Sequence, residues 1–282
     1  MQKLLILGAK GTLGQALIEQ FQENYEVIPF DKEDIDVTVT ETTREKITQM
    51  KPDIIINAAA YTKVDLCEEN RDLAFKVNSL GVYNLVKVCK EFHIDLVHFS
   101  TDYVFDGTKS SPYKETDTIQ PLNAYGISKV AGEYIIQAHL ENYFIIRTSG
   151  LFGGSPTQHS NFVTRMIGLS QKNMELRIVN DQILSPTYGP SLASSLTPLI
   201  ESKKYGTYHI TNQGSCTWYD FACEIFKILN NKINIIPISS TERVAPAKRP
   251  KYSVLSNEKA KKMGILPPPH WKDALKIYLN SL

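Results

Sequence analysis

The N-terminal stretch Lys3-Leu4-Leu5-Ile6-Leu7-Gly8-Ala9-Lys10-Gly11-Thr12-Leu13-Gly14 decides the fold. Its apolar run predicts a buried strand, and the G-x-x-G-x-x-G spacing of Gly8, Gly11 and Gly14 predicts a tight turn. An amphipathic helix is expected from about Thr12 to Gln22. Strand, glycine-rich turn and helix in this order are typical of a dinucleotide-binding unit, because backbone N–H groups at the helix N-terminus face a pyrophosphate.

A second expected strand, from Tyr25 to Phe30, ends at an acid, Asp31. An acid about 20 residues after the glycine-rich turn is placed to hydrogen-bond an adenosine ribose. Lys32 follows, and a basic neighbour can pair with a 2′-phosphate, so NADH and NADPH both stay open. Asp36 is placed to border the adenine. A tight strand-to-helix turn with an ordinary acid is the alternative interpretation of this region.

Beyond this unit, expected strands and helices alternate up to about residue 150. The strands fall at 53–57, 94–99 and 143–148, and the helices at 41–49, 69–92 and 125–139. This alternation predicts an α/β fold with a Rossmann-type doubly wound parallel sheet over residues 1–150. In residues 151–282 the regular alternation of strands and helices stops. We expect these residues to form a smaller α/β substrate-binding domain, with some segments returning to pack on the first domain.

Small residues follow the third expected strand, in the segment Asn57-Ala58-Ala59-Ala60-Tyr61-Thr62. At the carboxyl end of a parallel strand such residues allow a cofactor to lie against the backbone. Close packing of a helix on the strand would also favour alanine. Asn78, inside the expected helix over 69–92, is explained as well by a core amide and by itself indicates little.

The residues that carry chemistry are Ser100-Thr101-Asp102-Tyr103, after the fourth strand, and Tyr125-Gly126-Ile127-Ser128-Lys129 on the following helix. Tyr125 and Lys129 are four residues apart, so both side chains leave one helix face. An ammonium beside a phenol lowers the tyrosine pKa, which is ordinarily ~10. Such a phenol exchanges a proton with a carbonyl or alcohol oxygen that the Thr101 hydroxyl can orient, as hydride transfer requires. A surface i,i+4 pair and a turn hydroxyl are the alternatives.

Composition indicates an ordinary globular protein. The 282 residues are 42% hydrophobic and 22% charged with a net charge of +1, which argues against a nucleic-acid or membrane-surface partner. No apolar run approaches a membrane span and no signal-peptide layout precedes the first strand, so a cytoplasmic location is expected. The four cysteines and six histidines show no metal-ligand spacing.

Several segments spread over the chain are together more specific than the glycine loop: 57–65, 100–105, 123–126, 147–149, 181–182 with 185–187, and 249–250. With them the chain resembles the dTDP-4-dehydrorhamnose reductases, within the extended short-chain dehydrogenase/reductases, over nearly its whole length. The resemblance implies NAD(P)H-dependent reduction of the 4-keto group of a nucleotide-linked 6-deoxyhexose. It points to dTDP-4-dehydro-L-rhamnose as substrate, to dTDP-L-rhamnose for cell-surface or spore polysaccharide as product, and to a homodimer as a candidate assembly.

The resemblance also assigns roles to single residues. Tyr125 would donate a proton to the 4-keto oxygen, Lys129 would hold the nicotinamide ribose and lower the Tyr125 pKa, and Thr101 would polarise the carbonyl. The implied cofactor-binding residues are Gly8, Gly11, Thr12, Leu13, Gly14, Asp31, Asp36, Val37, Ala60, Tyr61, Thr62, Phe99, Ser100, Tyr125 and Lys129. The implied substrate contacts are Thr101, Asp102, Asn161 and Arg249; a structural acid, a helix cap and a solvated charge are the alternatives for the last three.

The chain departs from the family pattern at three places. Gly150 stands where family members carry a tryptophan that packs on the substrate, and the loop from Gly153 to Ser160 is longer than expected. Some members bind magnesium at a dimer interface through acidic residues. The matching positions here are Ala16, Pro190 and Ser191, which are poor ligands for a hard cation, so no metal site is predicted.

Two other functions are compatible with the fold. A sugar-nucleotide 4,6-dehydratase of this superfamily carries an acid after Ser-Thr-Asp, where Tyr103 stands here, so the residues favour reduction over dehydration or epimerisation. A non-catalytic subunit, similar to the regulatory β subunit of methionine adenosyltransferase, would keep the fold for partner binding. An inactive wild-type protein that binds a second protein tightly would indicate that role.

Overall fold

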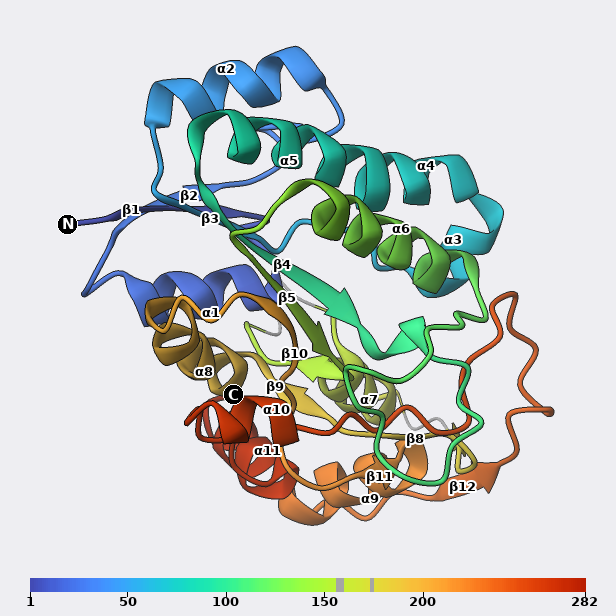
Figure 1. The fold of residues 1–282 in the computed structure, drawn as a ribbon. Coiled ribbons are helices and arrows are strands. Elements are labelled where there is room, and N and C mark those ends of the chain that lie inside the picture. The colour runs from blue at the N-terminus through green and yellow to red at the C-terminus, as the bar shows by residue number, and fades with distance from the viewer. Residues whose placement is uncertain (156–159, 173–174) are drawn as a thin grey trace.

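The computed structural model describes residues 1–155, 160–172 and 175–282. Its centre is a six-stranded parallel sheet in the order β10-β5-β4-β3-β1-β2 (Figure 1). The strands are β1 (Lys3–Leu7), β2 (Glu26–Phe30), β3 (Ile54–Asn57), β4 (Asp95–Thr101), β5 (Tyr143–Thr148) and β10 (Gly206–His209). The predicted α/β fold with a doubly wound parallel sheet is confirmed.

Helices cover both faces of the sheet (Figure 1). One face packs against α2 (Thr40–Met50), α5 (Gly81–Phe92) and α6 (Ala124–His139), and the other against α1 (Thr12–Phe21), α8 (Gly189–Glu201) and α10 (Glu258–Lys262). The three isoleucines of β3 are each at most 1% exposed because alternate side chains enter the two cores. No helix in the described part of the chain is both long enough and apolar enough to cross a membrane.

The helix expected over 69–92 is not one regular helix. It consists of α4 (Arg71–Phe75), a π-helical turn η1 (Lys76–Leu80) and α5, and a further helix, α3 (Val64–Glu69), precedes it. Apolar spacing predicted neither α3 nor the π-helical turn. The π-helical turn is hard to predict because one extra residue in a turn hardly changes the apolar pattern. A π-helical turn is rare and often marks a functional region.

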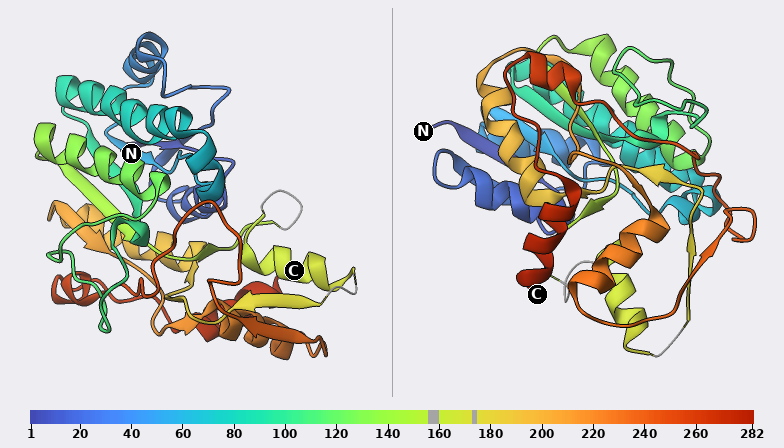
Figure 2. Two further views of the ribbon diagram at one scale, coloured as in Figure 1. Left: turned by 90° about the vertical axis from the view of Figure 1, so that its right-hand side faces the viewer. Right: turned by 90° about the horizontal axis from the view of Figure 1, so that it is seen from below.

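A second apolar core, the second lobe, lies beside the sheet. It contains β6 (Leu151–Phe152), α7 (Phe162–Ser170), β7 (Leu176–Val179), β8 (Ile183–Leu184), β9 (Thr187–Tyr188), β11 (Cys216–Thr217), α9 (Trp218–Ile228), β12 (Ile235–Ile238) and α11 (Trp271–Asn280). In Figure 2 its yellow-green to orange segments lie together, apart from the blue and teal helices. Between its segments, α8 returns to pack on α1 and β10 joins the main sheet beside β5. The division of the chain at residue 150 stays a prediction.

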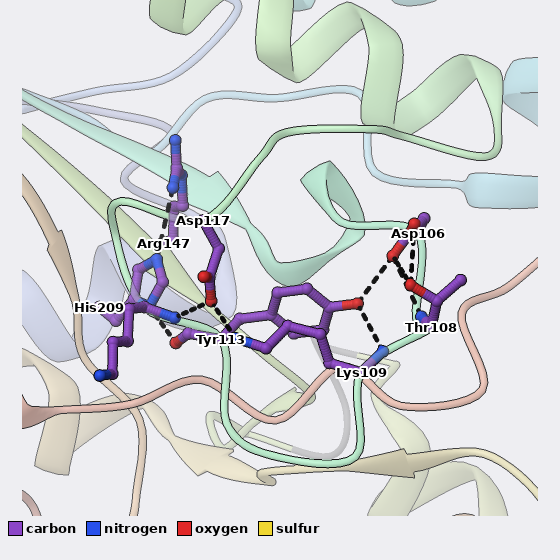
Figure 3. Close-up of polar contacts among 8 residues, drawn as sticks. Asp106, Thr108, Lys109, Tyr113, Asp117, Arg147 and His209 are labelled. Carbon is purple, nitrogen blue, oxygen red and sulfur yellow. Dashed lines mark hydrogen bonds and ion pairs between the residues drawn. The ribbon is translucent and has the colours of Figure 1, made fainter.

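A buried ion pair fastens α6 to the sheet. Arg147 on β5 and Glu133 on α6 are 2% and 0% exposed at their side chains, and the guanidinium meets the carboxylate at 2.9 Å (Nε to Oε1) and 2.6 Å (Nη2 to Oε2). Arg147 Nη1 also lies 3.4 Å from His209 Nε2, and His209 Nδ1 lies 3.0 Å from the Tyr113 carbonyl oxygen (Figure 3). These contacts tie β5, β10 and the loop that carries Tyr113 to one helix.

We predict that Glu133→Gln lowers the free energy of unfolding by about 3–5 kcal/mol, because it leaves the Arg147 guanidinium buried without its counter-charge. The matched control is Arg44→Gln, which breaks an exposed pair with Glu91 and is expected to lower the free energy of unfolding far less. Urea unfolding followed by circular dichroism measures both values. Equal, small losses in the two variants would show that the buried pair does not stabilise the fold.

Candidate active site

A cleft of about 990 Å³ opens at the carboxyl ends of the central strands, between the sheet and the second lobe. The chain leaves β1 toward β2 on one side and returns to β3 on the other, and such a reversal is where open α/β sheets bind ligands. The predicted site residues that line it are Gly11, Thr12, Leu13, Gly14, Ala60, Thr62, Phe99, Ser100, Thr101, Asp102, Tyr125, Lys129, Asn161 and Arg249. One cleft therefore gathers both halves of the predicted site.

Five predicted cofactor residues are not part of this lining: Gly8, Asp31, Asp36, Val37 and Tyr61. Gly8 has a φ of 79°, and a Cβ there would fall 2.8 Å from the Ala59 backbone nitrogen, so its visible role is to shape the turn. The Asp31 carboxylate accepts the Lys10 backbone N–H at 2.9 Å and closes the glycine loop onto the end of β2. Val37 packs against Gly81 in the core.

The glycine-rich turn and the cleft wall fit a dinucleotide. A Cβ at Gly14 would fall 2.1 Å from the Gly8 carbonyl oxygen, so only glycine lets α1 start this close to the loop. No side chain caps the N-terminus of α1, whose N–H groups and partial positive charge suit a pyrophosphate. Within the described chain the buried hydroxyls of Ser100 and Thr148, both in the cleft wall, have no hydrogen-bond partner. Bound hydroxyl or amide groups would satisfy them.

Thr101 and Asp102 form a buried polar group at the end of β4. Thr101 Oγ1 accepts the Tyr103 backbone N–H at 3.1 Å and donates to Asp102 Oδ1 at 3.0 Å. Ser149 Oγ donates to Asp102 Oδ2 at 2.9 Å. Burial raises the pKa of Asp102 to about 6, although these hydroxyls oppose the shift. Asp102 is thus an acid that titrates close to neutral pH and is held largely by side-chain hydroxyls.

Tyr125 and Lys129 face the cleft from the first turns of α6, where Asn123 Oδ1 caps the helix by accepting the Gly126 N–H at 2.8 Å. The expectation that Lys129 lowers the Tyr125 pKa is wrong for this structure. Burial, with the Asp102 carboxylate nearby, raises the pKa of Tyr125. Lys129 Nζ lies 3.2 Å from His98 Nε2 instead, and burial lowers its pKa to about 8. Tyr125 therefore keeps its proton at neutral pH, as a proton donor must.

Two buried residues that the motifs did not indicate hold this helix in place, Asn78 and His98. Asn78, in the π-helical turn, donates to Ser128 Oγ at 3.0 Å, and Ser128 Oγ donates to the Tyr125 carbonyl oxygen at 2.8 Å. The Asn78 amide also bonds the backbone N–H and carbonyl of Tyr61. The sequence did contain a signal: each is a polar residue in an otherwise apolar buried face, and such residues need partners.

Arg249 and Asn161 line the cleft but already have protein partners. Arg249 meets Asp65 in a bidentate ion pair at 3.0 Å (Nη1 to Oδ1) and 2.8 Å (Nη2 to Oδ2), so it is not a solvated charge. Asn161 caps α7, as its alternative interpretation held, because its Oδ1 accepts the Val163 N–H at 2.9 Å. Two other cleft arginines, Arg165 and Arg243, form no ion pair within the described residues, and no motif indicated them.

The position where relatives were expected to carry tryptophan is built for glycine. Gly150 lines the cleft with a φ of 53°, and a Cβ there would fall 2.5 Å from Leu184 Cδ1. A large side chain would need both a strained backbone and a displaced leucine. Residues 156–159 of the loop expected to be long lie outside the described residues. In the described ranges no three His, Cys, Asp or Glu side chains gather closely enough to hold a metal ion.

Asp102 gives the protein a pH-dependent stability. Its folded pKa of about 6 lies above its ordinary 3.8, so it contributes stability below pH ~4 that is lost as pH rises through 6, about 3 kcal/mol in all. We therefore expect Asp102→Asn to become more stable relative to wild type as pH rises from ~4 to ~8. Urea unfolding across that range measures the difference. A difference that stays constant with pH would contradict the raised pKa.

Known proteins are similar to this chain over its full length. The family model described as RmlD substrate binding domain matches residues 1–282. The spore coat polysaccharide biosynthesis protein SpsK of Bacillus subtilis (strain 168) is 39% identical over 282 residues, covering 100% of this chain and 98% of SpsK. The dTDP-4-dehydrorhamnose reductase of Aggregatibacter actinomycetemcomitans is 39% identical, covering 98% of each chain.

A solved structure is also similar to this chain from end to end. The dTDP-4-dehydrorhamnose reductase of Bacillus anthracis str. Ames, in complex with NADP, is 40% identical, with a TM-score of 0.96 and coverage of 100% of both chains. Fold and sequence thus match the same group of proteins from end to end. The chain therefore belongs to the RmlD family, that of the dTDP-4-dehydrorhamnose reductases.

Proposed function

We propose that the protein catalyses the NAD(P)H-dependent reduction of the 4-keto group of a nucleotide-linked 6-deoxyhexose, converting dTDP-4-dehydro-L-rhamnose to dTDP-L-rhamnose. One observation carries this proposal: Thr101, Tyr125 and Lys129 line the same cleft as the glycine-rich turn. Full-length relatives named for this activity, and one solved with NADP, support it. SpsK, named for spore coat polysaccharide biosynthesis, supports a product used for cell-surface or spore polysaccharide.

The residues divide the chemistry in a simple way. NAD(P)H, when bound, supplies a hydride to the carbonyl carbon of the sugar. Tyr125 donates its phenolic proton to the 4-keto oxygen as negative charge develops there, and its raised pKa keeps that proton available. The Thr101 hydroxyl orients the same oxygen, and Lys129 holds the ribose of the cofactor. The start of α1 holds the pyrophosphate.

The alternative reactions have less support. A dehydratase needs an acid after Ser-Thr-Asp, and Tyr103 stands there with its ring packed edge-on against Tyr125, at a centroid distance of 6.1 Å. A tyrosine at that place supplies no carboxylate base for the loss of water. A cytoplasmic location and a homodimer complete the proposal, and light scattering on the purified protein tests the second.

Arg243 and Arg165 are the proposed partners of the substrate diphosphate. Both line the cleft. Arg243 is an exposed residue, and partial desolvation together with the nearby charge of Arg249 lowers its pKa. A guanidinium that lacks a carboxylate partner suits two phosphate oxygens. The guanidinium of Arg249 is already paired with the Asp65 carboxylate, so Arg249 instead connects the segment before Pro250 to α3.

Tyr125→Phe tests the chemistry. It removes the phenolic proton and keeps the ring, so we expect kcat to fall about 10²–10⁴-fold while NADPH still binds. Nicotinamide absorbance measures turnover, and fluorescence of the bound cofactor measures binding. The control is Tyr134→Phe, an exposed tyrosine on the same helix, which should leave kcat unchanged. A wild-type protein that oxidises no NADH or NADPH with any nucleotide-linked 4-keto sugar would overturn the proposal.

Arg243→Gln tests the diphosphate contact. Losing a charge-assisted contact worth about 1.5–3 kcal/mol should raise the KM for the nucleotide sugar about ten- to a hundredfold, with little change in kcat. Arg44→Gln, remote from the cleft on α2, is the control for loss of one arginine. An unchanged KM in Arg243→Gln would remove this arginine from the substrate site.

A further inference from the structure

The strap, residues 239–250, follows β12 of the second lobe and reaches the cleft (Figure 1). Arg243, Arg249 and Pro250 of the strap line the cleft. The middle of the strap is mostly exposed, and Val244 there is not buried at all. The position of the Arg243 side chain therefore depends on how the two ends of the strap are held.

The first end of the strap is fixed by one carboxylate, Asp181. Its Oδ1 accepts the Ser240 backbone N–H at 2.9 Å, and its Oδ2 accepts the hydroxyls of Ser239 and Ser240 at 3.1 and 2.8 Å. Asp181 lies between β7 and β8, which belong to the second lobe. This anchor therefore attaches the strap only to its own lobe.

The second end is fixed by another carboxylate, Asp65, which belongs to α3 and not to the second lobe. Asp65 Oδ1 accepts the Ala247 backbone N–H at 3.3 Å, and the two Asp65 oxygens pair with Arg249 Nη1 and Nη2 at 3.0 and 2.8 Å. The side chains of Arg249 and Asp65 are 12% and 35% exposed, so the pair is partly shielded from water and salt. Asp65 thus attaches the strap to the part of the molecule that carries the central sheet.

The same end of the strap is joined to the helix that carries Tyr125. Asn123, whose Oδ1 caps α6, donates from its Nδ2 to the Lys248 carbonyl oxygen at 2.7 Å. The helix α3 holds the first residue of α6 as well, because Glu68 Oε1 accepts the Ala124 backbone N–H at 2.8 Å. The strap, α3 and the start of α6 therefore form one hydrogen-bonded unit.

The charges around the strap favour the same arrangement. Partial desolvation and the nearby charge of Arg249 lower the pKa of Arg243, and Arg165 acts in the same direction, whereas the Asp65 carboxylate opposes the shift. Asp65 therefore offsets part of the repulsion among these guanidiniums. Because the Asp65 oxygens are taken by Arg249, the Arg243 guanidinium stays available to phosphate oxygens.

We propose that Asp65 is a positioning residue for the substrate diphosphate: by holding Ala247 and Arg249 it fixes the strap to α3 and so sets the place of the Arg243 guanidinium. Thr62 and Val64, just before Asp65, line the cleft. One short segment therefore borders the cleft and also anchors the strap. The role in substrate binding rests on the proposed function, whereas the anchoring of the strap does not.

Amide hydrogen exchange in the full-length protein without ligands tests the anchor. Asp65→Asn keeps the size of the side chain but removes its charge and one acceptor oxygen, so we expect the Ala247 amide to exchange at least about tenfold faster while β4 keeps its protection. Asp72→Asn, which changes an exposed acid on α4, is the control and should leave Ala247 unchanged. Equal exchange at Ala247 in Asp65→Asn and wild type would refute the anchor, whatever the protein catalyses.

A double-mutant cycle tests whether Asp65 acts through Arg243. We expect Asp65→Asn to raise the KM for the nucleotide sugar about tenfold with little change in kcat, and to add little to the KM of Arg243→Gln, because the contact is already lost there. Increases that multiply would mean independent roles, and a lowered KM would mean that the released Arg249 binds substrate; either result rejects the proposal. If no nucleotide-linked sugar is reduced, the proposed function fails and the substrate role of Asp65 with it, while the exchange result still decides the anchor.

Discussion

A parallel sheet covered by helices on both faces holds no water, so a polar side chain on an interior strand must find its partner within the protein. Three such residues decide the geometry here: Asn57 on β3, His98 on β4 and Arg147 on β5, none more than 2% exposed. Arg147 pairs with Glu133, while Asn57 and His98 lead to Lys129. Both lines end on α6. The need to satisfy buried polar groups therefore fixes the helix that presents Tyr125 to the cleft.

The same helix is fixed from its other side by the π-helical turn. Asn78 reaches Ser128 there, and Ser128 bonds the Tyr125 carbonyl oxygen. A reacting phenol gains little from correct chemistry if it is misplaced by a fraction of an ångström, and rigid neighbours remove that freedom. The contacts that stabilise α6 on the sheet are therefore also the ones that position its functional side chains.

The two halves of the cleft are made differently. On the cofactor side the backbone shapes the cleft, because a Cβ at Gly14 would fall 2.1 Å from the Gly8 carbonyl oxygen. On the substrate side the work is done by side chains from distant segments, such as Arg243 and the Asp65–Arg249 pair. Gly150, where a tryptophan was expected, leaves that side with a different wall. A backbone-made site tolerates few substitutions, whereas a side-chain-made site can change its substrate without changing the fold.

The sequence by itself determined the strands, most helices, the glycine-rich turn and the Tyr125–Lys129 pair, because burial periodicity and turn chemistry are local properties of the chain. Only the tertiary structure decided which way these groups titrate and with whom they pair. The Tyr125 pKa is raised because the phenol is buried beside the Asp102 carboxylate, Lys129 contacts His98, and Arg249 pairs with Asp65, far away in the sequence. Depth of burial and long-range pairing depend on how the elements pack together, and no local pattern records them.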